Sequence, residues 1–486
     1  MAPAADGGPA ASNSSDRLPE RRCKLPGACP AAFPATRAVA VTPALGRGAA
    51  TRPLYRRAIQ PSRADGADPV DALAILSSGP ERAVALRRAG RLPGTIPSMT
   101  DDPARPLLRL SAPRDGAAPL QLGQRVTLYV CGITPYDAAH LGHAFTYAVF
   151  DTLVRFLRDR GYQVLYCQNV TDVDDDVLRR AVRNGEDYLE LGRRETAAYL
   201  REMDALGIIR PTWLPRATQE IPAMVELASE LQSAGSLYEV DGTLFFDVTT
   251  FPGFGDLSGL DEDTQRKLLA ERGGDPEDPR KRHPLDFVVW QRAAHGEPSW
   301  ESPWGLGRPG WHLECSAMSR RHLGVTIDLH GGGADLLYPH HESERAQSET
   351  ANGVPFVRRW LHTGMVRHEG EKMSKSLGNL VFAHDLAREH EPAAVRLALL
   401  SHHYRGSWEF DPGELKEAAE RLDGWRRAAR GASLGSPLPE PVDAALAHDL
   451  DTPAALAEID ALAAAGEGAA VRAAAAVLGV ALKPAD

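Results

Sequence analysis

The stretch RVTLYVCGITPYDAAHLGHAFTYAVFDTLVRFLRDRGYQVLYCQNVTD, residues 125–172, decides the fold of this chain. Its first seven residues are mostly apolar, β-branched or aromatic, which predicts a buried strand. Apolar residues then recur at three- to four-residue spacing from Leu141 to Leu157, which predicts a helix, and Gly161 stands where helices commonly end. A second apolar run from residue 162 completes a strand–helix–strand unit. Such a unit implies a parallel sheet with a right-handed crossover, and therefore an α/β fold.

The remaining sequence predicts further parts of the same fold. Strand patterns return at residues 325–333 and 358–366, after a charged segment at about 185–300 that we interpret as a helical insertion. Residues 1–105 lack apolar periodicity and predict a disordered extension, with Met99 as an alternative start. The predicted divisions are a catalytic domain over 106–370, a lysine-bearing loop and connecting region over 371–412, and a short C-terminal helical domain over 413–486.

Composition and charge narrow the class of protein. The chain is 43% hydrophobic and 25% charged, which is typical of a folded globular protein. No apolar run reaches the roughly 18 residues of a membrane span, so we expect no membrane association. Five widely spaced cysteines argue against a disulfide framework and favour a cytoplasmic location. Residues 1–99 hold 14 Lys and Arg against 7 Asp and Glu, so the rest of a chain with net charge −10 is acidic, which argues against a broad nucleic-acid surface.

A histidine pair stands between the first predicted strand and the helix. His140, Gly142 and His143 lie beside the helix N-terminus, whose N–H groups favour anions. Glycine permits close approach of a ligand, and two imidazoles can donate hydrogen bonds to phosphate oxygens. The pattern indicates a phosphate site, although a motif this short also arises by chance.

A lysine-bearing loop follows much later in the chain. In EKMSKSLGN, residues 371–379, Lys372 and Lys375 flank Met373 and Ser374 in a polar, glycine-ended segment. Ammonium groups suit a pyrophosphate that gains charge during transfer. A solvated basic surface loop is the alternative.

Together and in this order, the two motifs resemble the paired nucleotide motifs of class I aminoacyl-tRNA synthetases. The resemblance implies a Rossmann-type catalytic domain that activates a carboxylate by adenylation. It also implies that ATP, accompanied by Mg2+, lies over the turn between His140 and His143. The expected catalytic residues are His140, His143, Lys372 and Lys375.

A third group of residues has the chemistry of a metal site. GWHLECSAMS, residues 310–319, contains Cys315, and GGGADLLYPHHESE, residues 331–344, contains His340, His341 and Glu344. With Cys131 they offer two thiols and an imidazole, a set that binds zinc, and Glu344 is an optional fourth ligand. These residues lie too far apart for a zinc finger, so the fold would have to assemble the site. Unrelated buried side chains are the alternative.

All these segments resemble the cysteinyl-tRNA synthetase family, over about residues 125–480. In that family one zinc per chain is held by the residues matching Cys131, Cys315 and His340, and it takes the thiolate of substrate cysteine. A soft thiolate prefers zinc far more than a hydroxyl does, so the metal would separate cysteine from serine, which pocket size does poorly. The resemblance places these residues around a cysteinyl-adenylate: Cys131, Gly132, Ile133, Thr134, Thr146, Asn169, Val170, Thr171, Trp311, Gly333, Ala334, Asp335 and Val366. TDVDDD, residues 171–176, indicates Mg2+ or an acidic helix N-terminus equally well.

Two branches of the family differ in their acceptor. CGITPYD, QNVTDVDD and ERGGDP (residues 271–276) resemble the mycothiol-pathway ligase, which joins cysteine to the amine of glucosaminyl-inositol. The chain also runs only 110 residues past Ser376, where a tRNA synthetase normally continues into an anticodon-reading domain. ECSAMS, HHESE and Leu377 resemble the tRNA-charging branch instead. We therefore expect a monomeric ligase that uses ATP, L-cysteine and glucosaminyl-inositol. A shortened cysteinyl-tRNA synthetase that charges tRNA and an inactive zinc-binding relative are the alternatives.

Overall fold

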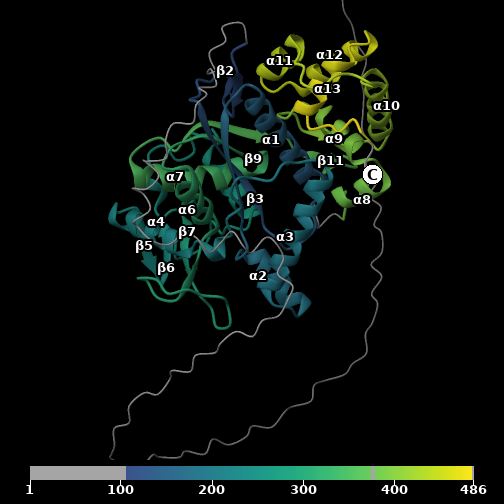
Figure 1. Cartoon of the computed structure of the whole chain (residues 1–486). Coiled ribbons are helices and arrows are strands. Elements are labelled where there is room, and N and C mark those ends of the chain that lie inside the picture. Colours follow the sequence, from purple (N-terminus) through teal and green to yellow (C-terminus); the bar gives the residue numbers. More distant parts are fainter. Residues whose placement is uncertain (1–105, 374–377, 484–486) are drawn as a thin grey trace, which may run out of the picture. The chain divides into compact units, whose positions relative to one another are not determined.

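A four-stranded parallel sheet lies at the centre of the computed structural model, which describes residues 106–373 and 378–483 (Figure 1). The extension predicted for residues 1–105, with Met99, lies outside the described residues. Neighbouring strands of the sheet are parallel throughout, which confirms the predicted α/β class. In spatial order the strands are β10 (Val357–Thr363), β9 (Ile327–Gly333), β3 (Arg125–Ile133) and β4 (Gln163–Val170).

Helix α1 (Leu141–Asp159) connects β3 to β4, as the opening stretch predicts. Phe145, Val149 and Leu153 all lie on its buried face, at the spacing that indicated a helix. The helix ends at Arg160, and Gly161 follows with φ +84°, a left-handed conformation that favours glycine. Arg160 forms a buried ion pair with Asp443 of α11 (Glu440–Ala447), which ties the end of α1 to the C-terminal helices.

The insertion contains helices and, in addition, a second sheet. Its strands pair antiparallel in the order β5-β6-β7-β8. The sequence predicts only helices for about residues 185–300, so this sheet is a difference from the prediction. Strands as short as TLFF and FVVWQR cannot be distinguished from buried helix by periodicity. From the end of β4 to the end of this second sheet the elements are α2 (Asp175–Asn184), α3 (Tyr188–Ala205), η5 (Ala217–Gln219), α4 (Ile221–Ser233), β5 (Leu237–Val240), β6 (Thr243–Phe246), η6 (Val248–Thr250), α5 (Glu262–Glu271), β7 (Phe287–Arg292) and β8 (Gly307–Pro309).

Four helical elements on either side of β9 bring distant segments to the sheet. Helix α6 (Trp311–Leu323) packs against β3 and β4, and α7 (Glu342–Asn352) packs against α6. Between β9 and α7 run the short turns η7 (Ala334–Leu336) and η8 (Leu337–His341). The segments that contain Cys315 and His340 are therefore brought together next to the central sheet.

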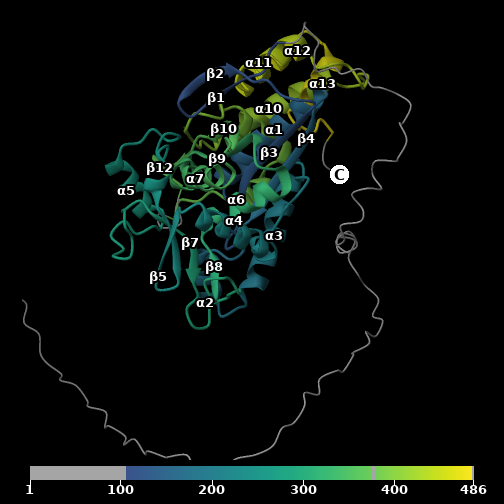
Figure 2. The same ribbon diagram turned by 90° about the vertical axis from the view of Figure 1, so that its left-hand side faces the viewer.

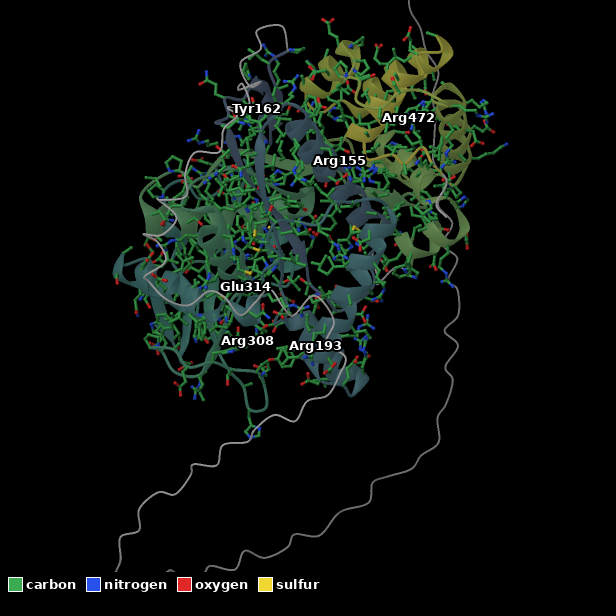
Figure 3. The ribbon with its side chains drawn as sticks, in the orientation of Figure 1. Arg155, Tyr162, Arg193, Arg308, Glu314 and Arg472 are labelled. Carbon is green, nitrogen blue, oxygen red and sulfur yellow. The ribbon has the colours of Figure 1, made fainter. Side chains whose placement is uncertain are left out.

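A small sheet and a group of helices follow β10. Strand β11 (Val366–His368) pairs with β12 (Glu371–Lys372) and with β13 (Trp408–Glu409). Helices α11 to α13 group together beside α10 (Figure 2). Arg155 of α1 and Arg472 of α13, both labelled in Figure 3, line one pocket. The remaining elements are α8 (Ala383–Glu389), α9 (Pro392–Leu400), α10 (Gly413–Ala428), α12 (Thr452–Ala464), α13 (Gly468–Val477) and the hairpin β1 (Arg109–Ala112) and β2 (Asp115–Pro119).

Apolar side chains of the described residues form four buried clusters, the smallest of which holds Val177, Ala181 and Leu191 of α2 and α3. One joins α1 and the central sheet to the C-terminal helices, and a second lies within the insertion and α6. A third, smaller cluster combines Cys131, Cys167 and Cys315 with aromatic rings. In the part of the chain that the structure describes, no helix is long and apolar enough to span a membrane.

Candidate active site and metal centre

Four potential metal ligands converge at the end of β3. Cys131 Sγ lies 3.9 Å from Cys315 Sγ of α6 and 3.5 Å from Glu344 Oε1 of α7. His340 Nε2 lies 3.3 Å from Cys315 Sγ and 3.1 Å from Glu344 Oε1. All four residues are buried, and their ligand atoms lie within 4.8 Å of one another. The fold therefore assembles the predicted set, including Glu344.

The spacing of these atoms fits a tetrahedral cation. A zinc ion with bonds of about 2.0–2.3 Å holds its ligand atoms roughly 3.3–3.8 Å apart. Four of the six separations between these atoms, at 3.1–3.9 Å, lie close to that range, and all six are within 4.8 Å. Two thiols, one imidazole and one carboxylate are also ligands that zinc accepts in proteins.

Burial disfavours the charged forms of the side chains in this cluster. It raises the pKa of the Cys131 and Cys315 thiols, and it lowers the pKa of His340 well below its usual value. Each shift favours the uncharged form of the side chain. A bound divalent cation would reverse this preference for the thiols, because it stabilises thiolates.

Neighbouring rings fix the orientation of His340. Its Nδ1 lies 2.9 Å from Nδ1 of His312, so one of these two atoms carries the shared proton. When that proton resides on His340, its Nε2 keeps a lone pair directed at Cys315 and Glu344. Trp311 stacks on the same imidazole at 4.1 Å between centroids. The predicted substrate residue Trp311 therefore lies directly beside the metal cluster.

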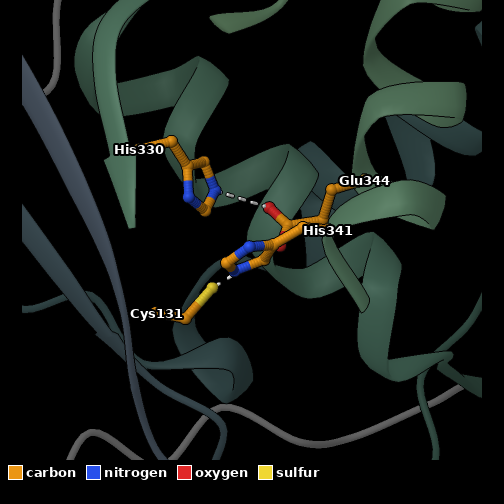
Figure 4. A group of neighbouring side chains, drawn as sticks. All are labelled: Cys131, His330, His341 and Glu344. Carbon is orange, nitrogen blue, oxygen red and sulfur yellow. Dashed lines mark hydrogen bonds and ion pairs between the residues drawn. The ribbon is translucent and has the colours of Figure 1, made fainter. Parts of the chain in front are cut away.

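A second ligand set shares two members with the first (Figure 4). Cys131 and Glu344 also group with His330 and His341, and His330 Nε2 lies 3.0 Å from Glu344 Oε2. The two oxygens of Glu344 thus face different histidines. Neither His330 nor His341 was predicted as a ligand, although His341 directly follows His340 and His330 directly precedes the segment 331–344 that supplied it.

His140 and His143 form the start of α1 in an unusual way. His140 Nδ1 accepts a hydrogen bond from the Gly142 N–H, and His143 Nδ1 accepts one from the His140 N–H. Their rings pack 3.9 Å apart. A neutral imidazole that accepts at Nδ1 carries its proton on Nε2, so each ring is set as a donor at Nε2. A side chain at position 142 would lie 2.9 Å from His140, which explains the glycine.

The ends of β3 and β4 are joined by predicted substrate residues. The Gly132 N–H donates to Asn169 Oδ1 at 2.8 Å, and the Asn169 amide donates to Cys315 Sγ at 3.4 Å. The Thr134 and Thr171 hydroxyls lie 2.8 Å apart. Ile133 and Val170 are buried beside them. Asn169 therefore links the strand ends to the metal cluster.

Three of the residues predicted around the adenylate, Gly333, Ala334 and Asp335, lie at the end of β9 and in the turn that follows it. The Thr146 hydroxyl of α1 pairs with the Thr363 hydroxyl of β10 at 2.7 Å. Gly333 ends β9, and Ala334 and Asp335 follow in η7, where a Cβ at position 333 would lie 2.5 Å from Asp335 Oδ1. Val366 is buried in β11, which belongs to a different sheet. Lys375 lies outside the described residues, and only the backbone of Lys372 is described, in β12.

Three of the four aspartates in residues 171–176 start a helix. Asp174 caps α2 by accepting from the Asp176 N–H at 2.9 Å, and Asp175 and Asp176 occupy the first turn. Buried Glu314 of α6 lies close to this turn and to Arg308 (Figure 3). Burial raises the pKa of Glu314 well above its usual value and raises the pKa of Asp174 to about 6. Asp174, Asp175 and Asp176 thus form the acidic helix N-terminus of the second interpretation, whereas Asp172 accepts hydrogen bonds from the Thr218 N–H and hydroxyl. The Mg2+ interpretation stays a prediction.

Comparison with known proteins identifies close relatives. The model of the class I (C) tRNA synthetase catalytic domain matches residues 119–420. The L-cysteine:1D-myo-inositol 2-amino-2-deoxy-alpha-D-glucopyranoside ligase of Kribbella flavida is 51% identical over 340 residues, which cover 68% of this chain and 83% of that protein. The protein of the same name from Streptomyces griseus is 51% identical over 351 residues, 71% of this chain and 86% of that protein.

Solved structures of more distant proteins share the fold. Mycobacterium tuberculosis methionyl-tRNA synthetase bound by methionyl-adenylate aligns with a TM-score of 0.54 at 18% identity, over 74% of this chain and 88% of that one. A leucyl-tRNA synthetase from Agrobacterium radiobacter K84 also aligns with a TM-score of 0.54, at 12% identity, over 75% and 83% of the two chains. These similarities confirm the predicted synthetase-type architecture.

Proposed function

Because this chain belongs to the class I (C) tRNA synthetase family, among its L-cysteine:1D-myo-inositol 2-amino-2-deoxy-alpha-D-glucopyranoside ligases, we propose that it activates L-cysteine as cysteinyl-AMP and transfers it to the amine of glucosaminyl-inositol. The enzyme is an ATP-dependent ligase. The two-step route and the acceptor are the proposed parts, as are the roles of individual residues.

In the first step a carboxylate oxygen of cysteine attacks the α-phosphorus of ATP. A P–O bond forms, the bond to pyrophosphate breaks, and Mg2+ accompanies the nucleotide. Nε2 donors on His140 and His143 are suited to hold phosphate oxygens as charge develops, because both rings are fixed by the start of α1. Lys372 and Lys375 supply further positive charge to the leaving pyrophosphate.

Selection of cysteine is assigned to the residues around Cys131. Cys131, Cys315 and His340, with Glu344, would hold a zinc ion, which supplies a soft Lewis acid for the substrate thiolate. Trp311 covers His340, and Asn169 holds the strand ends at a fixed spacing beside the thiols. Serine, which lacks a soft donor atom, would bind poorly despite its similar size.

In the second step the free amine of the acceptor attacks the acyl carbon. The C–N bond forms, the bond to AMP breaks, and the amine loses a proton. We assign a sugar amine rather than tRNA because the relatives that are about half identical carry the name of the inositol-glycoside ligase. The acidic charge of residues 100–486 also disfavours a long phosphate track.

The observation that carries the proposal is the convergence of one ligand set with one histidine pair. Cys131 lies two residues before the end of β3, and His140 is the N-cap of the helix that follows it, so the thiol site and the phosphate site are separated by a single loop. A cysteine whose sulfur lies at Cys131 can thus present its carboxylate toward the start of α1. That arrangement suits adenylation of cysteine.

The test separates activation from transfer. Purified protein is given ATP and labelled pyrophosphate with cysteine or serine, and then ATP and labelled cysteine with glucosaminyl-inositol or cysteine tRNA. We expect cysteine-dependent pyrophosphate exchange without acceptor, no exchange with serine, and amide formation with the sugar amine only. Absence of exchange would contradict the adenylate route. Charging of tRNA would instead establish the synthetase alternative.

A further inference from the structure

One buried carboxylate links three distant segments of the chain. Asp449, 2% exposed, lies in the turn between α11 and α12. Its Oδ1 accepts from the Ser111 N–H and from the Tyr404 hydroxyl, each at 2.7 Å. Its Oδ2 accepts from the Ser111 hydroxyl and pairs with Arg405 Nε, each at 2.8 Å. The N-terminal hairpin, the 404–405 segment and the C-terminal helices thus share one group.

The backbone at this carboxylate adopts a costly conformation. Asp449 and Leu450 have φ +59° and φ +50°, and neither is glycine. The left-handed region is tolerable for aspartate but costs about 1–3 kcal/mol for most other residues. The Asp449 N–H donates to the Arg109 carbonyl at 2.8 Å, so the strained turn is held against β1. The β1–β2 hairpin indeed lies beside α11 in both views (Figure 1, Figure 2). Strain retained in this way commonly accompanies a positional requirement.

The segment that Asp449 holds is itself bonded to the hairpin of β11 and β12. The Tyr404 carbonyl accepts from the Gly364 N–H at 2.6 Å, and the Ser407 hydroxyl accepts from the Met365 N–H at 3.0 Å. Strand β13 then pairs with β11, and Glu409 Oε1 accepts from the Gly370 N–H at 3.0 Å in the hairpin turn. This series of bonds continues from Tyr404 to the turn of the hairpin.

Close packing leaves this connection little freedom. A side chain at Gly364 would lie 2.1 Å from the Gly406 carbonyl, so the two backbones are in direct contact. Arg367 of β11 pairs with Lys372 of β12, so the hairpin backbone carries one of the proposed catalytic lysines. A shift of residues 404–406 would therefore move the β11–β12 hairpin.

We propose that Asp449 is a positioning residue for the β11–β12 hairpin, and that the C-terminal helices act on the ATP step of the ligase through it. The proposal rests on the proposed function only in assigning Lys372 to ATP. Asp449 touches no substrate. Its carboxylate fixes the positions of Tyr404 and Arg405. The backbone bond between Tyr404 and Gly364 then fixes the position of the β11–β12 hairpin.

Asp449→Asn is the informative variant. Asparagine tolerates the left-handed backbone and keeps an oxygen for Ser111 and Tyr404, but its NH2 group opposes Arg405 Nε. Asp443→Asn is the matched control, because Asp443 is also a buried carboxylate that ties the C-terminal helices to the rest of the protein. Its partner is Arg160 at the end of α1, with bonds of 3.1 Å and 2.6 Å, rather than the 404–410 segment.

Two measurements on the full-length chain test the proposal. In Asp449→Asn we expect amide hydrogen exchange of residues 364–373 to rise at least tenfold, and cysteine-dependent pyrophosphate exchange to slow by about 10- to 100-fold, mainly through KM for ATP. Metal content should equal that of the unmodified enzyme. Asp443→Asn should lower the unfolding temperature. It should leave amide hydrogen exchange of residues 364–373 and KM for ATP within twofold of the values for the unmodified enzyme.

Each outcome decides something. Equal rates of amide hydrogen exchange for residues 364–373 in the two variants would overturn the inference. An unchanged KM for ATP in Asp449→Asn would also overturn it. If the unmodified enzyme shows no cysteine-dependent pyrophosphate exchange, the proposed function fails, while amide exchange still decides whether Asp449 holds the hairpin. Should Asp449→Asn not fold, Tyr404→Phe removes one bond to the same carboxylate and is judged by the same two readings.

Discussion

Gly132→Ala tests whether the spacing of β3 and β4 governs activation. A methyl group at position 132 would lie 1.6 Å from the Asn169 carbonyl oxygen and 2.7 Å from its carbon. These are backbone atoms of the paired strand, so no side-chain rotation relieves the contact. Since such contacts rarely fall below 3.0 Å, the strand ends must part by about 1.4 Å, and misplacements near 1 Å can cost about 10²-fold in rate.

The displacement should act on both sides of the site. It breaks the bond from Gly132 to Asn169 and turns the Asn169 amide away from Cys315. We therefore expect cysteine-dependent pyrophosphate exchange to fall by about 10²-fold or more, with a lower unfolding temperature. Gly123→Ala is the control, because its methyl would meet only the Arg125 carbonyl at 3.7 Å, an ordinary contact. Exchange in Gly132→Ala within threefold of the Gly123→Ala rate would refute the reasoning.

Three further predictions follow from the site and its surroundings. Cys315→Ser should lower bound zinc, measured by elemental analysis, and reduce the preference for cysteine over serine in pyrophosphate exchange; unchanged metal content would remove Cys315 from the ligand set. Lys375→Ala should slow adenylate formation by roughly 10²–10³-fold in single-turnover measurements while cysteine affinity is retained, and a normal rate would indicate a solvated loop. Burial raises the pKa of Asp174 from 3.8 to about 6, so the folded state binds more protons than the unfolded state between these values, and stability is lost as pH rises through about 6. Asparagine at position 174 keeps the helix cap but carries no charge, so Asp174→Asn should raise the free energy of unfolding at pH 7 by at most about 3 kcal/mol and should give no gain at pH 4. A denaturation curve at pH 7 equal to that of the unmodified protein would contradict this.

The central sheet was predictable because its signals are local. Apolar runs of seven or eight residues marked β3 and β4, and the spacing of Phe145 and Val149 marked α1. The second sheet was not predictable in this way, since its strands have three to six residues and no alternation. Short antiparallel strands depend on partners that a local pattern does not reveal.

Prediction of the site depended on residue types and family resemblance rather than on geometry. Cys131 and Glu344 are 213 positions apart, and no spacing rule joins them. His330 was missed because a histidine inside an apolar strand is equally well explained by packing, and only the fold directs its Nε2 at Glu344. Asp449 had no sequence signal at all, because its partner Ser111 lies 338 residues away.

The histidine pair at the start of α1 has a consequence for how related chains diverge. The same two rings that would serve the phosphates also supply both Nδ1 acceptors of the helix start. A descendant that abandoned catalysis would still be under selection to keep them, because losing a helix cap costs about 1 kcal/mol. Retention of both histidines in a distant relative is therefore weak evidence of activity. Replacement of position 140 by asparagine, which caps helices without an imidazole, would be the clearer sign that catalysis has been lost and the fold kept.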